Sequence, residues 1–217
     1  MKNNGIGKLF FYSDQVVESP GNQRLDALLF EGLEISTVQV GYIPSTEDKR
    51  KQYFQTKVQY YQDYGVTNFL YFDLYSEFNS LKIKDLLQCD MIHLSAGNPV
   101  DFGNAMTHRG MDKILVEYVQ NGGIIVGVSG GGVLLGESVN LFQLFIDDDK
   151  QSSETLQFVD FEFLPHYNRW NEDFKQKVRE YSERKRKKIV CVNDGDGLMV
   201  DGDSIRMIGN VQVIGGS

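Results

Sequence analysis

Residues 121–137 read NGGIIVGVSGGGVLLGE and carry the strongest structural signal in the chain. The glycines at 122 and 123 are typical of the end of a helix. The apolar, β-branched run Ile124–Val128 then predicts a short strand that is buried on both faces. Ser129 follows at once, between glycines. We therefore expect a sharp turn from this strand into a helix, with Ser129 at the turn.

Two interpretations of this turn have to be compared. Residues 127–131 match G-x-S-x-G, the nucleophile elbow, in which a serine stands on a strained turn and the next backbone N–H faces a developing oxyanion. Glycine-rich turns between a strand and a helix also bind phosphates. However, the glycine spacing is not that of a dinucleotide site, and no Lys-Ser/Thr pair follows as in a P-loop. The pentapeptide alone leaves both interpretations open, so partner residues elsewhere must decide between them.

Strand-like and helix-like segments alternate before the glycine-rich turn. The predicted strands are residues 8–13, 35–43, 67–73 and 90–95, and the predicted helices are residues 22–30, 45–64, 81–88 and 112–120. This alternation predicts an α/β fold with a doubly wound, mostly parallel sheet. In such a sheet, functional residues lie at the carboxyl ends of the strands.

The pattern changes after residue 137. Residues 141–146 and 155–163 predict two strands, separated by an acidic loop at 147–149. Residues 170–184 predict a helix, and residues 188–193, 197–200, 204–208 and 211–214 predict short strands joined by glycine turns, which would form a C-terminal hairpin extension. No linker, repeat or low-complexity tract interrupts the chain, so a single domain over residues 1–217 is the simplest organisation.

Composition limits the classes of function. The net charge of −8 disfavours nucleic acids and anionic membranes as partners. The basic run at 183–188 is best explained as the solvated end of a helix. No apolar run approaches the length of a membrane span, and the two cysteines, Cys89 and Cys191, lie in apolar strand-like surroundings that favour reduced thiols. Together these features predict a cytoplasmic protein with no metal site.

A serine nucleophile needs a base, and the sequence offers three histidines. His93 lies inside a predicted buried strand, where a structural role is favoured. His108 stands in a polar segment and is expected to be solvated. His166 follows Leu164-Pro165 at the end of a predicted strand, where its side chain can reach the carboxyl edge of the sheet. His166 is therefore the best candidate base.

A carboxylate and an oxyanion hole would complete the site. Asp194 is the first acidic residue beyond the strand at 188–193, although Asp-Gly is also a favoured turn sequence, and from position alone the turn interpretation is slightly favoured. The backbone N–H of Gly130 could supply one oxyanion donor. Gly97 or Asn98, in the loop after the neighbouring strand, could supply the other, unless this loop is an ordinary turn into a helix.

Four short motifs, at residues 95–98, 127–131, 165–167 and 193–195, together resemble the serine peptidase family of bacterial dipeptidase E, peptidase family S51. The resemblance extends over almost the whole chain. It implies a flavodoxin-like sheet related to class I glutamine amidotransferases. It also implies a Ser-His-acid mechanism without a cofactor, with Ser129 as nucleophile, His166 as base and Asp194 as acid. The acid of the family is often Glu, so the shorter Asp194 requires a closer approach of the backbone to His166.

The resemblance also bears on the substrate, which we expect to be a dipeptide or short peptide. The aspartyl dipeptidases of this family hold an acidic side chain with an arginine in the helix after the histidine. Here that position falls near Phe174, and the nearby Arg169, a candidate substrate-binding residue, is offset. A strict preference for N-terminal aspartate is therefore doubtful. A cyanophycinase-like peptidase and a non-catalytic ligand-binding protein on the same fold are the alternatives, and the oligomeric state is left open, with a homodimer as one option.

Overall fold

The computed structural model describes residues 7–147 and 153–216. Its strands are β1 (Lys8–Tyr12), β2 (Gln39–Ile43), β3 (Asn68–Tyr71), β4 (Met91–Leu94), β5 (Ile124–Val128), β6 (Glu162–Leu164), β7 (Ile189–Val192), β8 (Gly197–Asp201), β9 (Ser204–Ile208) and β10 (Val211–Ile214). Its α-helices are α1 (Pro20–Leu29), α2 (Gln52–Gln62), α3 (Ile83–Leu86), α4 (Pro99–His108), α5 (Met111–Gln120), α6 (Gly130–Leu135), α7 (Asn140–Ile146) and α8 (Glu172–Lys185). Two single 3₁₀ turns are η1 (Ser80–Lys82) and η2 (Tyr167–Arg169).

The main sheet has seven strands in the order β3-β2-β4-β5-β1-β8-β9. The pairs among β3, β2, β4, β5 and β1 are parallel, whereas β8 runs antiparallel to β1 and forms a hairpin with β9. The mostly parallel α/β fold expected from the sequence is therefore confirmed. Because β1, β4 and β5 are adjacent and parallel, the residues that follow them meet at one edge of the sheet.

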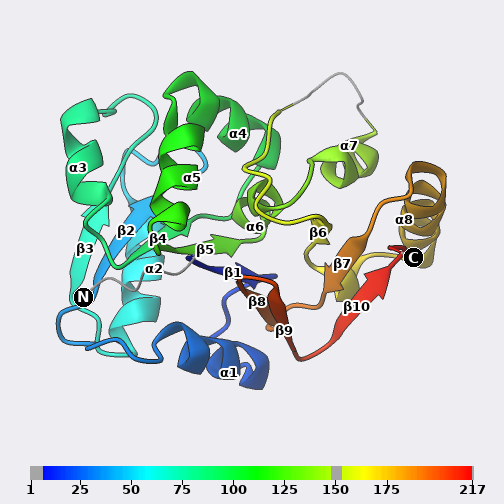
Figure 1. The fold of residues 1–217 in the computed structure, drawn as a ribbon, viewed down its shortest axis with the longest axis horizontal. Coiled ribbons are helices and arrows are strands. Elements are labelled where there is room, and N and C mark those ends of the chain that lie inside the picture. The colour runs from blue at the N-terminus through cyan, green and yellow to red at the C-terminus, as the bar shows by residue number, and fades with distance from the viewer. Residues whose placement is uncertain (1–6, 148–152, 217) are drawn as a thin grey trace.

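Helices cover both faces of this sheet (Figure 1). Along β1, Leu9 and Phe11 pack with α4 and α5, whereas Phe10 and Tyr12 pack with α1 and α2. Strand β5 divides in the same way, with Ile125 in the first cluster and Val126 in the second. This alternation follows from the two-residue period of a strand. It explains why these strands read as continuous apolar runs.

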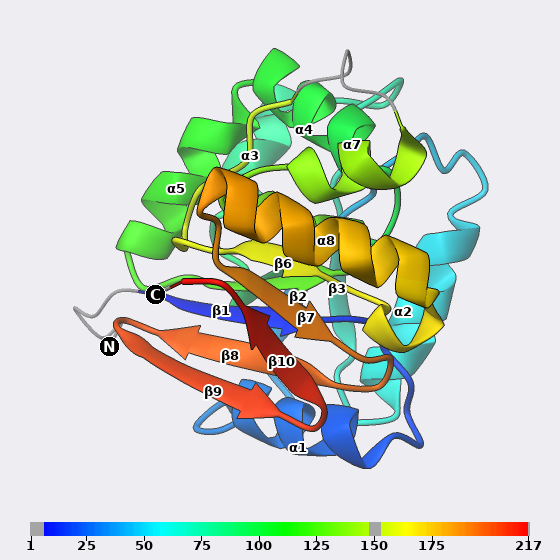
Figure 2. The ribbon, with the colours of Figure 1, turned by 90° about the vertical axis from the view of Figure 1, so that its right-hand side faces the viewer.

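A smaller sheet has the order β10-β7-β6, with β6 and β7 parallel and β10 antiparallel to β7. Helix α8 lies across this sheet (Figure 2). The contact is made by Val178 and Tyr181 of α8, which are buried with apolar residues of β6 and β7. On its other side, Phe163 of β6 belongs to the same core cluster as Phe11 of the main sheet, and their ring centroids are 5.3 Å apart. The carboxyl ends of β6 and β7 thereby reach the site formed after β5.

Two segments differ from the sequence expectation. Residues 141–146, predicted as a strand, belong to helix α7, and of the strand predicted at 155–163 only residues 162 and 163 are extended, within β6. Leu141 and Leu144 have helical spacing and both pack in the cluster under α8. A short apolar run of this kind fits the side-chain period of a strand or of a helix. Packing against α8 favours the helix here. Of the acidic loop at 147–149, only Asp147 lies within the described residues.

Helix α2 begins later than the sequence suggests. Ser45 and Thr46 were the expected caps, but the helix starts at Gln52. The side chain of Asp48 accepts hydrogen bonds from the backbone N–H groups of Gln52 and Tyr53, at 2.9 and 3.0 Å. Asp48 thus satisfies the free N–H groups of the first turn. Ser45 instead donates to the carbonyl of Ala96, 2.5 Å away, and so connects the loops after β2 and β4.

Candidate active site

Ser129 stands at the point where β5 turns into α6. Its backbone has φ 51° and ψ −112°, a conformation that a non-glycine residue adopts only when the surrounding structure imposes it. The backbone N–H of Ser129 donates to the carbonyl of Tyr12 at 2.9 Å, which connects the turn to the end of β1. The sharp turn expected from the sequence is present, and it raises the serine side chain above the edge of the sheet.

His166 reaches Ser129 from the smaller sheet. The histidine follows β6 after Pro165 and has a left-handed backbone, with φ 60°. Its Nε2 lies 2.8 Å from Ser129 Oγ. Its backbone N–H donates to Ser13 Oγ at 2.7 Å, and Ser13 is the buried residue that follows β1. The position of the imidazole is therefore fixed by a hydrogen bond of the His166 backbone as well as by the contact of its ring with Ser129.

Asp194 lies on the other side of the imidazole. It follows β7, which is parallel to β6, and its Oδ1 is 2.6 Å from His166 Nδ1. The side chain of Asn168 accepts the backbone N–H of Asp194 at 2.8 Å and so fixes the turn that carries it. Burial alone would raise the pKa of Asp194, but hydrogen bonds from His166 and Arg169 outweigh it and lower this pKa below its ordinary value. The carboxylate is held in its ionised form.

Sequence reasoning missed two residues that support this arrangement, Ser13 and Asp14. Ser13 Oγ accepts from His166 and lies 3.4 Å from Asp194 Oδ1. Asp14 accepts from Arg169 Nη2 at 3.1 Å. Both residues follow β1, the strand beside β5. Their position after a parallel strand adjacent to the glycine-rich turn was the available signal.

Arg169, the candidate substrate-binding residue, forms ion pairs within the protein. Its Nε donates to Asp194 and its Nη2 to Asp14. Its side chain remains 55% exposed. It does not line either of the two cavities beside Ser129 that are described below. A role in substrate binding stays a prediction, while the contact with Asp194 is a structural fact.

The loop after β4 approaches the loop after β5 very closely. A Cβ placed on Gly130 would overlap the carbonyl oxygen of Gly97, and one placed on Gly97 would overlap the Ser45 hydroxyl. Gly97 has φ 145°, which also favours glycine. Within the described residues, the backbone N–H groups of Gly97, Asn98 and Gly130 have no hydrogen-bond acceptor. Asn98 also caps α4, because its side chain accepts from Val100 N at 2.9 Å.

The other histidines lie away from Ser129. His93 is fully buried in β4, and its Nδ1 is 2.9 Å from the hydroxyl of Tyr61. Burial, followed by the charge of Lys57, lowers the pKa of His93 well below its ordinary value, so that the ring is neutral. His108 is the last residue of α4, a helix that the sequence analysis did not predict.

Two cavities meet at Gly97. One, of about 160 Å³, lies directly beside the serine and histidine and is lined by Gly97, Pro99, Ser129, Gly130, Leu141, Phe142, Phe145, Phe163, Leu164, Pro165, His166 and Trp170. The other, of about 380 Å³, extends from the same glycine toward α2 and includes Tyr42, Tyr53 and Lys57 in its lining. The two cavities share Gly97, and only the smaller one includes Ser129 and His166 in its lining.

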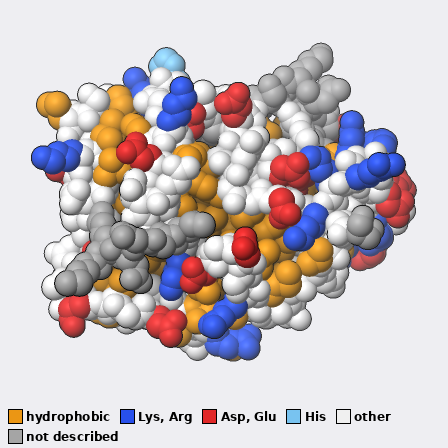
Figure 3. Space-filling model, viewed as in Figure 1, with side chains coloured by type: hydrophobic (Ala, Val, Ile, Leu, Met, Phe, Trp, Pro, Cys, Tyr) orange, Lys and Arg blue, Asp and Glu red, His pale blue; other side chains and the backbone are white. Residues whose placement is uncertain are grey.

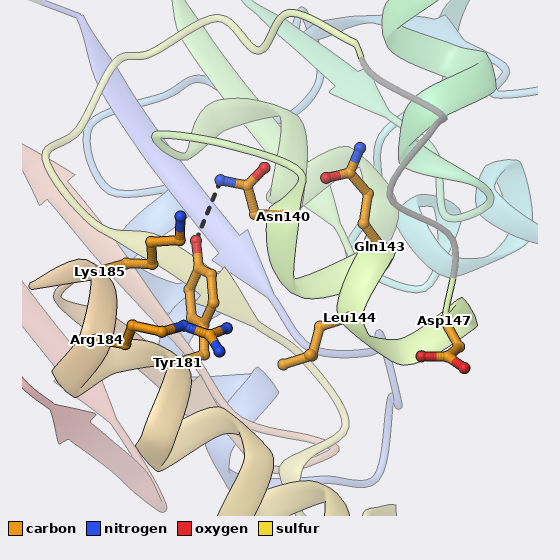
Figure 4. Close-up of a pocket in the computed structure, with 7 residues that line it drawn as sticks. All are labelled: Asn140, Gln143, Leu144, Asp147, Tyr181, Arg184 and Lys185. Carbon is orange, nitrogen blue, oxygen red and sulfur yellow. Dashed lines mark hydrogen bonds between the residues drawn. The ribbon is translucent and has the colours of Figure 1, made fainter.

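A third cavity, of about 530 Å³, opens between α7 and α8, and its lining includes neither Ser129, His166 nor Asp194 (Figure 4). Asn140 and Tyr181 face each other across it, with Asn140 Nδ2 donating to the Tyr181 hydroxyl at 3.1 Å. Arg184 and Lys185 lie in the last turn of α8. This helix end accounts for the basic run noted in the sequence, and Figure 3 shows Lys and Arg side chains gathered at that end of the molecule.

Across residues 7–147 and 153–216, no helix is long and apolar enough to cross a membrane. The same residues contain no group of three or more His, Cys, Asp or Glu side chains arranged to hold a metal ion. Cys89 and Cys191 are both buried free thiols.

Comparison with known proteins defines the class of the protein. The chain belongs to peptidase family S51, which it matches over residues 9–208, and the resemblance noted in the sequence is confirmed. The catalytic candidates, and the main sheet apart from Lys8, lie within the part of the chain that the family shares.

Particular relatives carry peptidase names. The chain is 28% identical over 124 residues to an uncharacterized peptidase of Listeria monocytogenes, and this alignment covers 54% of the chain and 58% of that protein. It is 25% identical over 123 residues to the peptidase E of Streptomyces coelicolor, and this alignment covers 54% of the chain and 51% of that protein. These alignments span about half the length of the curated relatives.

Solved structures share the fold. A crystal structure described as a peptidase E from Listeria monocytogenes superposes with a TM-score of 0.74 at 20% identity and covers 94% of this chain and 99% of its own. A peptidase from an acI-B1 Actinobacterium superposes with a TM-score of 0.68 at 17% identity and covers 100% of this chain and 90% of its own. At these identities the likeness is one of fold.

Proposed function

We propose that this protein is a serine peptidase that hydrolyses dipeptides or short peptides through Ser129, His166 and Asp194. The observation that supports the proposal is the hydrogen-bonded line from Ser129 Oγ through the two nitrogens of His166 to Asp194, at 2.8 and 2.6 Å. With Nδ1 protonated and donating to Asp194, Nε2 is free to accept the serine proton. Membership of a peptidase family supports the same reaction class.

The reaction begins with attack of Ser129 Oγ on the scissile carbonyl carbon. His166 Nε2 takes the hydroxyl proton, and Asp194 stabilises the imidazolium that forms. The protonated His166 then gives the proton to the leaving amine, and an acyl-enzyme remains on Ser129. Water, deprotonated by His166, attacks the acyl-enzyme. The bond to Ser129 Oγ then breaks, His166 returns the proton to Oγ, and the acid is released. No cofactor takes part in this scheme.

The oxyanion formed in each step needs preorganised donors. The backbone N–H of Gly130 follows Ser129 directly, and the N–H groups of Gly97 and Asn98 belong to the loop that contacts Gly130. Loss of one donor in such a site costs about 3–4 kcal/mol of transition-state stabilisation. The strained turn at Ser129 supports the assignment of a nucleophile elbow, because strain of this kind is retained where it positions a reacting group.

A fluorophosphonate probe tests the nucleophile directly. We expect it to label the wild-type protein and the Ser36→Ala control, which alters an exposed serine, but not Ser129→Ala. Hydrolysis of a dipeptide panel can be measured from the amine that is released. The kcat of Ser129→Ala should be roughly 10⁴- to 10⁶-fold lower than that of the wild type. Unchanged turnover in that variant would remove Ser129 from the mechanism. A wild-type protein that is folded by circular dichroism but is neither labelled nor active would favour the non-catalytic alternative.

A further inference from the structure

The cavity beside Ser129 has an unusually uniform lining. Apart from Ser129 and His166, every described residue that lines it is a glycine, a proline, an aliphatic or an aromatic residue. Its aromatic wall is built by helix α7, by the segment that precedes α8 and by β6. Phe142 and Phe145 come from α7, Trp170 precedes α8, and Phe163 lies in β6. The cavity thus places an apolar surface against the two groups that would react.

The aromatic wall is a connected cluster. The ring centroids of Phe145 and Trp170 are 4.7 Å apart, and those of Trp170 and Phe174 are 4.9 Å apart. Phe145 also approaches Phe174, at 5.9 Å. The indole Nε1 of Trp170 donates to the carbonyl of Pro165 at 2.9 Å, which fixes the ring beside the residue that precedes His166. The wall is therefore held in place relative to the imidazole.

One face of this cluster is open. Phe145 remains 49% exposed, although Trp170 and Phe174 cover part of its ring. Phe145 of α7 contacts Phe174 of α8, so its ring stands where these two neighbouring helices meet (Figure 2). Burial of such a ring by a ligand is favourable, because apolar surface leaves water.

Charge argues against an acidic side chain in this cavity. Among the residues that the structure describes, no Lys or Arg lines it, and the nearby Arg169 is directed to Asp14 and Asp194. Lys175 of α8 pairs with Glu172, at 3.0 Å. A substrate carboxylate placed among these rings would lose its hydration without gaining a cation.

The volume suits one side chain. The cavity measures about 160 Å³. Apolar cavities of about 150 Å³ in proteins stay dry and bind benzene. A phenyl ring or a branched aliphatic group therefore fits, whereas a methyl group would leave most of the space empty.

We propose that this cavity selects peptides with an aromatic or large aliphatic residue next to the scissile bond. The inference rests on the proposed peptidase function and specifies its substrate class. Burial of a large apolar side chain should raise kcat/KM by roughly 10- to 100-fold over alanine at the same position. An aspartate at that position should be the poorest substrate.

The test is a dipeptide panel in which glycine is paired, in either order, with Phe, Leu, Ala or Asp. In the wild type we expect kcat/KM to be higher for the Phe and Leu peptides than for the Ala and Asp peptides in one of the two orders. The order in which this preference appears shows on which side of the scissile bond the cavity binds the side chain. Phe145→Arg introduces a cation at the open face and should lower kcat/KM for the Phe substrate at least 10-fold while raising it for the Asp substrate. Leu81→Ala, which changes an 84% exposed residue of η1, should leave both unchanged.

The outcomes separate the two proposals. If no dipeptide is cleaved and fluorophosphonate does not label Ser129, the proposed function fails. If Ser129 is labelled, a flat preference, a preference for Ala or Asp, or no cleavage of any panel member overturns the substrate assignment alone. A fluorophosphonate labelling rate equal to wild type in Phe145→Arg shows that this variant keeps its fold and its nucleophile.

Discussion

Arg169 and Asp194 form an ion pair in which the guanidinium Nε donates to the carboxylate oxygen that His166 leaves free. His166 binds Oδ1 and Arg169 binds Oδ2, so both oxygens of Asp194 are engaged. A carboxylate bound on both sides has little freedom to rotate. Arg169 therefore positions the group that positions the imidazole.

Arg169→Ala should lower kcat about fivefold and leave KM unchanged, because it removes a partly exposed charged hydrogen bond from Asp194 and no contact with the peptide. Steady-state kinetics on one peptide separates the two parameters. Arg179→Ala is the matched control, since Arg179 of α8 bonds only to Gln176 among the described residues. A raised KM with unchanged kcat would instead support the substrate-binding role predicted from the sequence.

Asp194→Asn should reduce kcat by about 10⁴-fold, because an amide favours the wrong tautomer of His166. It should also change the acid stability of the protein. The folded-state pKa of Asp194 is lowered, so its contribution to the free energy of unfolding is present above the unfolded value near 3.8 and is lost as the pH falls through the lower folded value.

Urea unfolding from pH 3 to pH 7 measures this second effect. The difference in the free energy of unfolding between wild type and Asp194→Asn should be constant above about pH 5 and should shrink below about pH 4. A difference that stays constant down to pH 3 would show that the carboxylate gains nothing from its partners.

Ser13→Ala should lower kcat by about tenfold without abolishing the reaction. The hydroxyl accepts the backbone N–H of His166, so its removal leaves a part-buried donor unsatisfied and loosens the turn that holds the imidazole. The free energy of unfolding should fall by about 1–2 kcal/mol. Kinetics and urea unfolding provide both values, with the exposed Ser36→Ala as control. Wild-type kcat in Ser13→Ala would contradict a positioning role for this hydroxyl.

Asp26 is fully buried and accepts hydrogen bonds from the hydroxyls of Tyr12, Tyr60 and Tyr64, at 2.7, 2.6 and 2.6 Å. Burial raises its pKa despite these bonds. Between the ordinary value of 3.8 and the raised value, the folded protein keeps a proton that the unfolded chain has released. The free energy of unfolding therefore falls as the pH rises through this window.

Asp26→Asn should remove that decrease, and it should cost about 1–3 kcal/mol at neutral pH because one amide oxygen cannot serve three hydroxyl donors. Urea unfolding at several pH values compares the variant with Asp63→Asn, which changes an exposed carboxylate at the end of α2. If Asp26→Asn and wild type show parallel pH profiles, Asp26 is not the source of the dependence.

Many strands of the two sheets were predictable because they carry a local signal. The buried, β-branched run of β5 and the short strands β9 and β10 are identified by composition alone, and the structure places β9 and β10 at their expected residues. Helix α4 was missed because its last turn contains Thr107 and His108, and Gly103 interrupts its interior. The space around Gly103 explains that glycine, since a Cβ there would overlap the Ser153 hydroxyl.

The candidate site was partly predictable for a different reason. Ser129, His166 and Asp194 each follow a strand, and strand ends are where an α/β sheet places functional groups. The contacts of Ser13 with His166 and of Arg169 with Asp14 form only when the smaller sheet docks on the main one. Ser13 and His166 are 153 positions apart in the sequence. No local pattern encodes such a contact.

The division of the site between two sheets has a consequence for biosynthesis. Ser129 follows a strand of the main sheet, whereas His166 and Asp194 follow strands of the smaller one and are translated later. A nascent chain that has already completed β5 carries an unactivated hydroxyl, because neither the base nor its carboxylate partner has emerged. On the proposed mechanism, a chain in which β6 and β7 have not yet docked would be inert toward neighbouring polypeptides, and hydrolytic competence would arise only with that docking.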